Sequence, residues 1–379
     1  MSQINLIRQI SNSKNLLDKL TIVIPSINHG FLLERSIEYW RNIPVKVHIV
    51  DGSKAAQFAV TDFRDTENIS YHHAHFSDEK WSNFFSIMNF ASKLPTTKYS
   101  AICGDDDFFT YSGLISCLES LEKSNSVDAA LGRIAYFRES SAPRKWSMKG
   151  LNHRPTPLQS SSNLLDRETV KTPWLMYGIV KTEMWSKLLQ ISYAERLPHL
   201  ELHELLVREL SWIMCRTSLN DQLLSIRQFT IPGSNIGEPV KLNDWLMETM
   251  NSEVRNQIKE KLLLGLNFAN PNYSQSAGEK LCDNVLSKYI KVLKSDKVAK
   301  SNAKILKQTL LKFVPRNVKV AAMFFLNTSY ALQVTTFSLT FFLLFLSKAR
   351  ISYSRSEVKT VARLLCEDHD QFGVRAISR

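Results

Sequence analysis

Residues 20–53 read LTIVIPSINHGFLLERSIEYWRNIPVKVHIVDGS, and this stretch decides the fold. Its first six residues are β-branched or apolar and end at Pro25, which predicts a short buried strand. Apolar side chains then recur at helical spacing from Phe31 to Trp40, and a second strand-like run, Val45 to Val50, stops at Asp51. A strand, a helix and a second strand in this order predict a β-α-β unit with parallel strands.

The same alternation continues along the chain. Residues 68–73 predict a third strand, residues 81–94 a helix, and residues 99–103 a fourth strand that leads through a glycine into three aspartates, Asp105 to Asp107. The long segment 140–173 is rich in Ser, Pro, Arg and Asn and predicts a loop. We therefore expect an α/β fold, with a mixed, mostly parallel sheet sandwiched by helices.

The three aspartates are the strongest chemical signal. Ligands of parallel sheets bind at the carboxyl ends of the strands, so Pro25, Asp51 and Asp105 are expected to share one rim. Adjacent carboxylates raise one another's pKa unless a cation compensates, and oxygen ligands suit Mg²⁺ or Mn²⁺, which a diphosphate can co-ligate. The alternative is a solvated acidic loop, or a helix start capped by Asp107 or Thr110.

Composition sets the wider limits. The chain has 379 residues, 44% hydrophobic and 22% charged, which indicates a folded protein of two units, 1–235 and 236–379. Its five cysteines are scattered without a C-x-x-C pair, which indicates a reduced, cytoplasmic protein without a structural zinc site. The first twenty residues contain no long apolar run, so we expect no secretory signal.

The end of the chain differs in character from the rest. The net charge is +12, and residues 288–319 are rich in lysine and arginine, whereas residues 320–347 carry no charge. We expect a C-terminal helical, basic and apolar region that contacts an anionic membrane surface through residues 288–350. The protein would then lie peripherally or monotopically at the inner face of the cell membrane. The alternative is a buried helical pair in an ordinary globular domain.

Three stretches together resemble the family 2 type glycosyltransferases of GT-A fold: TIVIPSIN (21–28), VDGS (50–53) and YSAICGDDD (99–107). The likeness covers residues 18–230. It implies an enzyme that moves a sugar from a nucleoside diphosphate sugar, UDP-linked in the first instance, to a hydroxyl of a glycan or lipid-linked acceptor. It further implies inverting, metal-dependent transfer in surface polysaccharide or glycolipid synthesis. The chain lacks the Q-x-x-R-W signature of processive synthases, so we expect non-processive transfer.

The resemblance also implies roles for single residues of the donor pocket. Pro25, Ser26 and Asn28 would line the donor nucleotide, and Asp51 would contact its base. The family's common Pro-Thr-Tyr-Asn start reads Pro-Ser-Ile-Asn here, so Ile27 replaces an aromatic residue.

For the acidic triplet, the resemblance implies that Asp105 contacts the ribose and that Asp107 binds Mn²⁺ or Mg²⁺. Asp106 could share either task. Arg227 could reach the diphosphate, and a packing role for it is at least as well founded. The acidic residue that often follows this motif is Phe108 here.

A transferase of this kind needs a base for the acceptor hydroxyl, and a carboxylate is the usual choice. The family's base lies on a later helix, where this chain reads HLELHEL, residues 199–205. Glu201 and Glu204 are three residues apart and can share a helix face. We favour Glu201, with Glu204 and His203 as competitors, and helix capping remains the structural alternative.

Other classes of protein fit the sequence less well. Glycine-rich phosphate loops are absent from the sequence, which argues against kinases and dehydrogenases. The basic charge leaves one rival, a nucleic-acid- or membrane-binding protein on a degenerate, inactive GT-A scaffold. Nucleic acid is the less favoured partner, because a binding module has no need of three aspartates at a strand rim.

Overall fold

The β-α-β unit expected at residues 20–53 forms as β1 (Leu20–Ser26), α2 (Gly30–Arg41) and β2 (Lys46–Asp51). β1 and β2 are parallel, with Ser26 beside Asp51 in the register. The structure is a computed structural model, and it describes residues 14–59, 67–139, 146–150, 175–195, 197, 200–229, 252–272, 274–284, 287, 354, 356–361 and 364.

Strands and helices continue to alternate after this unit. In chain order the further elements are β3 (Ile69–His73), α3 (Lys80–Ala91), β4 (Tyr99–Ile102), β5 (Phe108–Phe109), α4 (Tyr111–Lys123), β6 (Ala129–Glu139), β7 (Trp146–Gly150), η2 (Leu175–Tyr177), β8 (Ile179–Lys181), α6 (Thr182–Tyr193), α7 (Leu200–Met214), β9 (Thr217–Phe229) and α9 (Ser252–Ala269). The nine-stranded sheet has the order β3-β2-β1-β4-β8-β6-β9-β5, with β7 paired to β6. β3, β2, β1 and β4 are parallel, whereas β8 runs antiparallel to both of its neighbours. The expected α/β class with a mixed sheet is confirmed.

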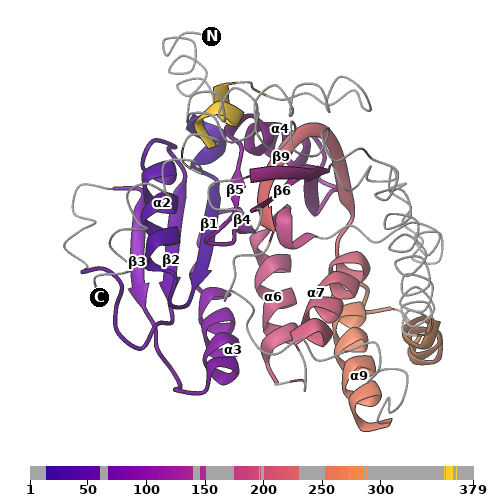
Figure 1. Cartoon of the computed structure of the whole chain (residues 1–379). Coiled ribbons are helices and arrows are strands. Elements are labelled where there is room, and N and C mark those ends of the chain that lie inside the picture. The colour runs from indigo at the N-terminus through magenta and orange to yellow at the C-terminus, as the bar shows by residue number, and fades with distance from the viewer. Residues whose placement is uncertain are drawn as a thin grey trace, which may run out of the picture.

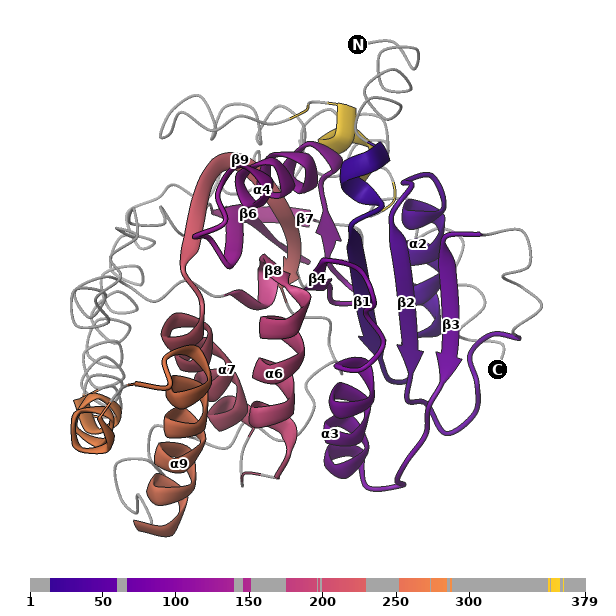
Figure 2. The same ribbon diagram turned by 180° about the vertical axis from the view of Figure 1, so that it is seen from behind.

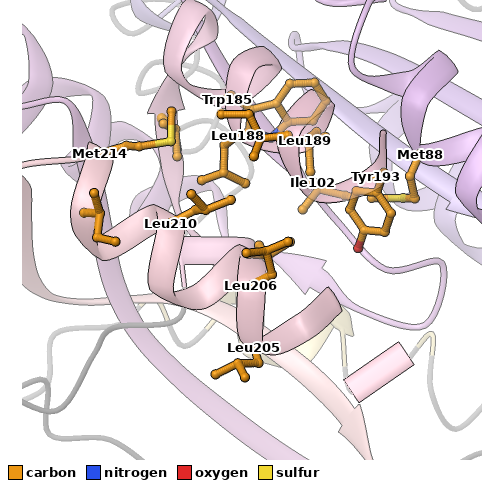
Figure 3. Packing of buried hydrophobic residues seen from close by; sticks show 14 of the residues in the cluster. Met88, Ile102, Trp185, Leu188, Leu189, Tyr193, Leu205, Leu206, Leu210 and Met214 are labelled. Carbon is orange, nitrogen blue, oxygen red and sulfur yellow. The ribbon is translucent and has the colours of Figure 1, made fainter. Parts of the chain in front are cut away.

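Strand side chains alternate between two helical layers, as the two-residue period of a strand requires. On β1, Val23 belongs to the core shared with α3, α6, α7 and α9, whereas Ile22 and Ile24 belong to the core shared with α2 and α4. Figures 1 and 2 show α6, α7 and α9 side by side. Figure 3 shows Trp185 and Leu189 of α6 near Leu206 and Leu210 of α7 within the first of these cores. The sheet is therefore buried on both faces, which explains the continuous apolar runs in its strands.

One expectation about a connection is wrong. Residues 146–150 lie within the segment predicted to be a loop, yet they form β7 and pair antiparallel with β6, with Trp146 opposite Glu139. Strand pairing between segments is a tertiary contact, so the local composition of this stretch did not indicate it. The rest of that segment, 140–145 and 151–173, lies outside the described residues.

The described parts of the C-terminal region are helical. α9 packs against α7, and its apolar residues Val254, Ile258, Leu262 and Leu266 are buried in the same core as α3 and α6. In the described part of the chain, no helix has the length and apolar character needed to cross a bilayer. The expected boundary at 235/236 and the expected membrane segment 288–350 both lie outside the described residues.

The chain returns to the sheet near its end. Residues 356–361 are helical, and Glu357 accepts hydrogen bonds from the backbone N–H of Ser112 (2.9 Å) and from its Oγ (2.6 Å). Ser112 lies in the first turn of α4, where backbone N–H groups lack partners within the helix, so Glu357 acts as a remote cap beside the local cap Thr110. The buried apolar side chains of this segment are Val358, Val361 and Leu364.

Two buried histidines make stability depend on pH. Burial lowers the pKa of His203 and, with the nearby His72, that of His48, in both cases to about 4. In the unfolded chain these histidines have a pKa near 6.5, so below that pH the unfolded chain binds protons that the folded chain does not bind. The contribution of the neutral histidines to stability is therefore complete above pH 6.5 and is lost as the pH falls towards 4. We expect the unfolding free energy to fall by on the order of 3 kcal/mol per histidine across that range.

Urea denaturation at a series of pH values measures this effect. His48→Asn is the matched variant, because an asparagine keeps a donor or acceptor near the position of Nδ1, which lies 2.9 Å from Nε2 of His72, but does not titrate. The variant should show a shallower fall. An identical fall in variant and wild type would contradict the assignment to His48.

Candidate active site

The carboxyl ends of the parallel strands meet at one rim, as expected. Ser26, at the end of β1, lies beside Asp51, at the end of β2. The Oγ of Ser26 donates to Oδ2 of Asp105, 2.6 Å away, and so joins the end of β1 to the turn that follows β4. The structure therefore brings together the residues of three separate sequence motifs, Pro25 and Ser26, Asp51, and Asp105.

Asp105 is held from two elements. Besides Ser26, the Nδ1 of His29 lies 2.8 Å from its Oδ2, and the Oγ of Ser36 on α2 donates to its backbone carbonyl (3.3 Å). Asp105 is 8% exposed. His29 and Ser36 were missed by the sequence analysis; the signal for His29 is its place next to Asn28 in the turn between β1 and α2.

Asp107 ties the triplet to β9. Its Oδ2 accepts from Nε of Arg227 (3.0 Å), and its Oδ1 accepts from the backbone N–H of Gln228 (3.0 Å). Burial raises the pKa of Asp107 in spite of the opposing influence of Arg227. The guanidinium of Arg227 in turn lies over the ring of Tyr177, 3.6 Å from its centroid. Both oxygens of Asp107 are therefore engaged by protein groups, which leaves this residue poorly placed for the metal-ligand role that the sequence suggested.

Asp106 is different from its two neighbours. It is half-buried, and within the described part of the chain its carboxylate has no hydrogen-bond or ion-pair partner. Burial and the adjacent carboxylates of Asp107 and Asp105 raise its pKa well above the ordinary value. A bound cation would relieve this repulsion, so the residue fits a divalent metal that prefers oxygen ligands. No group of three or more His, Cys, Asp or Glu side chains that could hold a metal is found among the described residues.

An arginine on α2 binds the backbone of the turn that contains the three aspartates. Arg35 is 4% exposed, and its Nη2 donates to the backbone carbonyl of Asp106 (3.4 Å) and to Oε1 of Gln228 (3.1 Å). Its guanidinium also lies 5.1 Å from the ring centroid of Phe108. Arg35 was not predicted from the sequence; a single arginine within the apolar face of a predicted helix was the available signal.

The turns at the rim depend on special backbone positions. Asn28 has a φ of 59°, a left-handed conformation that asparagine tolerates better than most residues, and its N–H donates to Oγ of Ser53 (2.8 Å). A Cβ on Gly52 would lie 1.8 Å from Cδ1 of Ile87, so glycine is required there. The predicted pocket residue Asn28 therefore lies against the loop after β2.

Asp51 lies at this rim but is fully buried. Its Oδ1 accepts from the N–H of Ser53 (2.9 Å), and its Oδ2 accepts from the N–H of Gln57 (2.9 Å) and from the hydroxyl of Tyr71. The carboxylate is therefore used by the protein itself, which does not fit the direct base contact that the resemblance implies.

The candidate bases on α7 differ in their surroundings. His203 is fully buried; its Nε2 accepts from the N–H of Leu197 (2.8 Å) and its Nδ1 lies 2.8 Å from the carbonyl of Ser192. Both ring nitrogens are engaged and burial lowers the pKa of His203 to about 4, which favours a packing role over that of a base. Nothing in its spacing distinguished a buried position from an exposed one.

Glu204 is half-buried on α7. The ring of Tyr177 packs against Arg227, and the pKa of its hydroxyl is raised first by burial and further by the negative charges of Asp107 and Glu204. Glu204 and the triplet thus act electrostatically on the same tyrosine. The helix containing Glu201 forms as predicted, and the side chain of Glu201 lies outside the described residues.

The fold and rim define an α/β protein with an acidic turn beside the buried Arg35 and the half-buried Arg227, at the carboxyl ends of parallel strands. Neither a scan against models of known protein families nor a search of curated proteins found a match for this chain.

The contact between Asp107 and Arg227 predicts a large effect on stability. Asp107→Asn leaves Arg227, which is 18% exposed, without this carboxylate, and we expect the unfolding free energy to fall by about 3 kcal/mol. Urea denaturation of wild type and variant measures the loss. Asp106→Asn, one residue away, is the control and should show none. Equal losses in both variants would contradict the separate roles.

Proposed function

We propose that this protein is a glycosyltransferase of GT-A type that moves a sugar from a nucleoside diphosphate sugar to a hydroxyl acceptor. One observation carries the proposal: three separate sequence motifs converge on one rim. There Ser26 donates to Asp105, beside the carboxylate of Asp106, which has no partner among the described residues. Such a rim, at the carboxyl ends of parallel strands, is where nucleotides bind in α/β folds.

Each acidic residue of the triplet has a distinct task in this proposal. Asp105, oriented by Ser26 and His29, would face the ribose, and Asp106 would hold Mn²⁺ or Mg²⁺ beside the donor's diphosphate. When bound, the metal neutralises charge on the departing nucleoside diphosphate. Asp107 keeps Arg227 in place, so that a second positive group lies beside the diphosphate site.

The acceptor side needs a base that removes the hydroxyl proton. Glu204 is our choice over Glu201, because its charge and that of Asp107 both raise the pKa of Tyr177, whose ring packs against Arg227. Inverting, non-processive transfer to a glycan or lipid-linked acceptor belongs to the same proposal. So does attachment of a cytoplasmic protein to an anionic membrane through residues 288–350.

A binding screen tests the proposal directly. UDP-, GDP- and dTDP-sugars are added with and without Mn²⁺, and the thermal midpoint of the protein is recorded. We expect one nucleotide class to raise the midpoint, and more strongly with Mn²⁺. Release of the nucleoside diphosphate on incubation would then show turnover. If no nucleotide sugar shifts the midpoint or releases its nucleotide, the rival view of an inactive scaffold is favoured.

A further inference from the structure

We infer that Asp51 is a positioning residue, which holds the loop after β2 through Tyr71 and does not touch the nucleobase. This inference rests on the proposed function, since it concerns the donor pocket of the same site. Asp51 is 0% exposed, and its carboxylate already accepts three hydrogen bonds. A carboxylate accepts about four. A base contact would require the loop to leave its present position.

Tyr71 is the second member of this arrangement. It lies on β3, and its hydroxyl donates to Asp51 while accepting from the N–H groups of Gln57 (3.0 Å) and Phe58 (3.4 Å). The ring of Phe58 packs edge-on against the ring of Tyr71, 6.0 Å between centroids. Asp51 and Tyr71 therefore bind the far end of the loop together.

The loop after β2 begins buried and then becomes exposed. Asp51, Gly52 and Ser53 are buried, whereas residues 54–57 are exposed. The carbonyl of Gly52 accepts from Nδ2 of Asn83 (2.6 Å), and the carbonyl of Ser53 lies 2.8 Å from Nε2 of His73. The beginning of the loop is thus fixed to α3 and β3, and its end is fixed by Asp51 and Tyr71.

This loop is joined to the acidic turn. The N–H of Ser53 donates to Asp51, and the Oγ of Ser53 accepts from the N–H of Asn28. The next residue, His29, contacts Oδ2 of Asp105. A short path of hydrogen bonds and one peptide link therefore runs from Asp51 to the carboxylate that we assign to the ribose.

The path predicts which part of the donor depends on Asp51. A residue that touches the base contributes to affinity only when the base is present. A residue that sets the position of the Asn28 turn and of Asp105 contributes to ribose and diphosphate binding, with or without a base. The two roles are separated by a ligand that lacks the base.

The experiment measures the affinities of UDP, GDP and ribose 5-diphosphate for wild type, Tyr71→Phe and Asp51→Asn by calorimetry with Mn²⁺. Tyr71→Phe is the main variant, because it removes one hydroxyl and leaves the ring packing intact. We expect it to weaken the tighter nucleotide and ribose 5-diphosphate by the same factor, about tenfold, as the loss of a hydrogen bond to a charged group implies. Asp51→Asn should weaken both ligands equally as well.

Tyr99→Phe is the matched control. The Tyr99 hydroxyl also donates to a carboxylate, that of Glu122 (2.6 Å), but at the start of β4 and away from the rim. It should leave both affinities unchanged, and thermal midpoints of all variants establish that each is folded.

Two results would overturn the inference while the proposed function stands. One is a Tyr71→Phe variant that binds both ligands as wild type does. The other is an Asp51→Asn variant that loses nucleotide affinity but keeps that for ribose 5-diphosphate, which identifies a direct base contact. A wild-type protein that binds none of the ligands overturns the proposed function, and this inference with it.

Discussion

Replacement of Asp106 by asparagine is expected to lower kcat/KM for sugar transfer by about 10²- to 10³-fold, the loss typical of removing one group that stabilises transition-state charge. The folded protein should be at least as stable as wild type. Asp106 has no partner among the described residues, and its pKa is raised by burial and by the charges of Asp107 and Asp105, so its replacement by a neutral residue relieves repulsion. A variant that is less active yet no less stable is the signature of a residue that serves a ligand.

The measurement combines initial rates at several Mn²⁺ concentrations with urea denaturation. The apparent affinity for Mn²⁺ should weaken together with the rate. Asp107→Asn is the contrasting variant, in which lower stability accompanies any loss of rate. If Asp106→Asn retains wild-type rates and Mn²⁺ dependence, the cation is held elsewhere.

Glu204→Gln is expected to lower kcat by about 10²- to 10⁴-fold, because a positioned general base contributes that much to proton transfer. Glutamine keeps the size of the side chain and cannot accept the proton. The acidic limb of the pH–rate profile should disappear in this variant, while the affinity for the nucleotide sugar stays within a few-fold of wild type.

Glu201→Gln, three residues earlier on α7, is the control for this prediction. It makes the same chemical change on the same helix. A loss of kcat in Glu201→Gln with none in Glu204→Gln would assign the base to Glu201. Equal small losses in both would remove the base from this helix.

Much of the fold was predictable because local and tertiary preferences agree. The β-branched runs around Ile22 and Ile49 are buried on both faces, so their apolar character alone identified central strands. The spacing of Leu202, Leu206 and Leu210 is that of an amphipathic helix, in agreement with α7. β7 was missed because a strand at the margin of a sheet is formed by pairing, and its composition resembles that of a loop.

The site was predicted in its location and less well in its roles. Strand ends located Asp51 and the three aspartates correctly, since parallel strands bring their carboxyl ends together. The roles of the single residues depend on burial and on hydrogen bonds within the protein. Arg227 and the backbone of Gln228 donate to Asp107, and Tyr71 donates to Asp51. Such partners lie 20 or more positions away in the sequence, and no local pattern reveals them.

The remote cap on α4 has a consequence for synthesis on the ribosome. Glu357 and the apolar residues after it emerge more than two hundred positions behind the helix that they complete, since Glu357 and Ser112 are separated by 245. Until then the first turn of α4 lacks this carboxylate, and the core beside β1 lacks the buried side chains of residues 358, 361 and 364. The sheet can assemble as it is translated, but α4 and this core are completed only after residues 357–364 have left the ribosome.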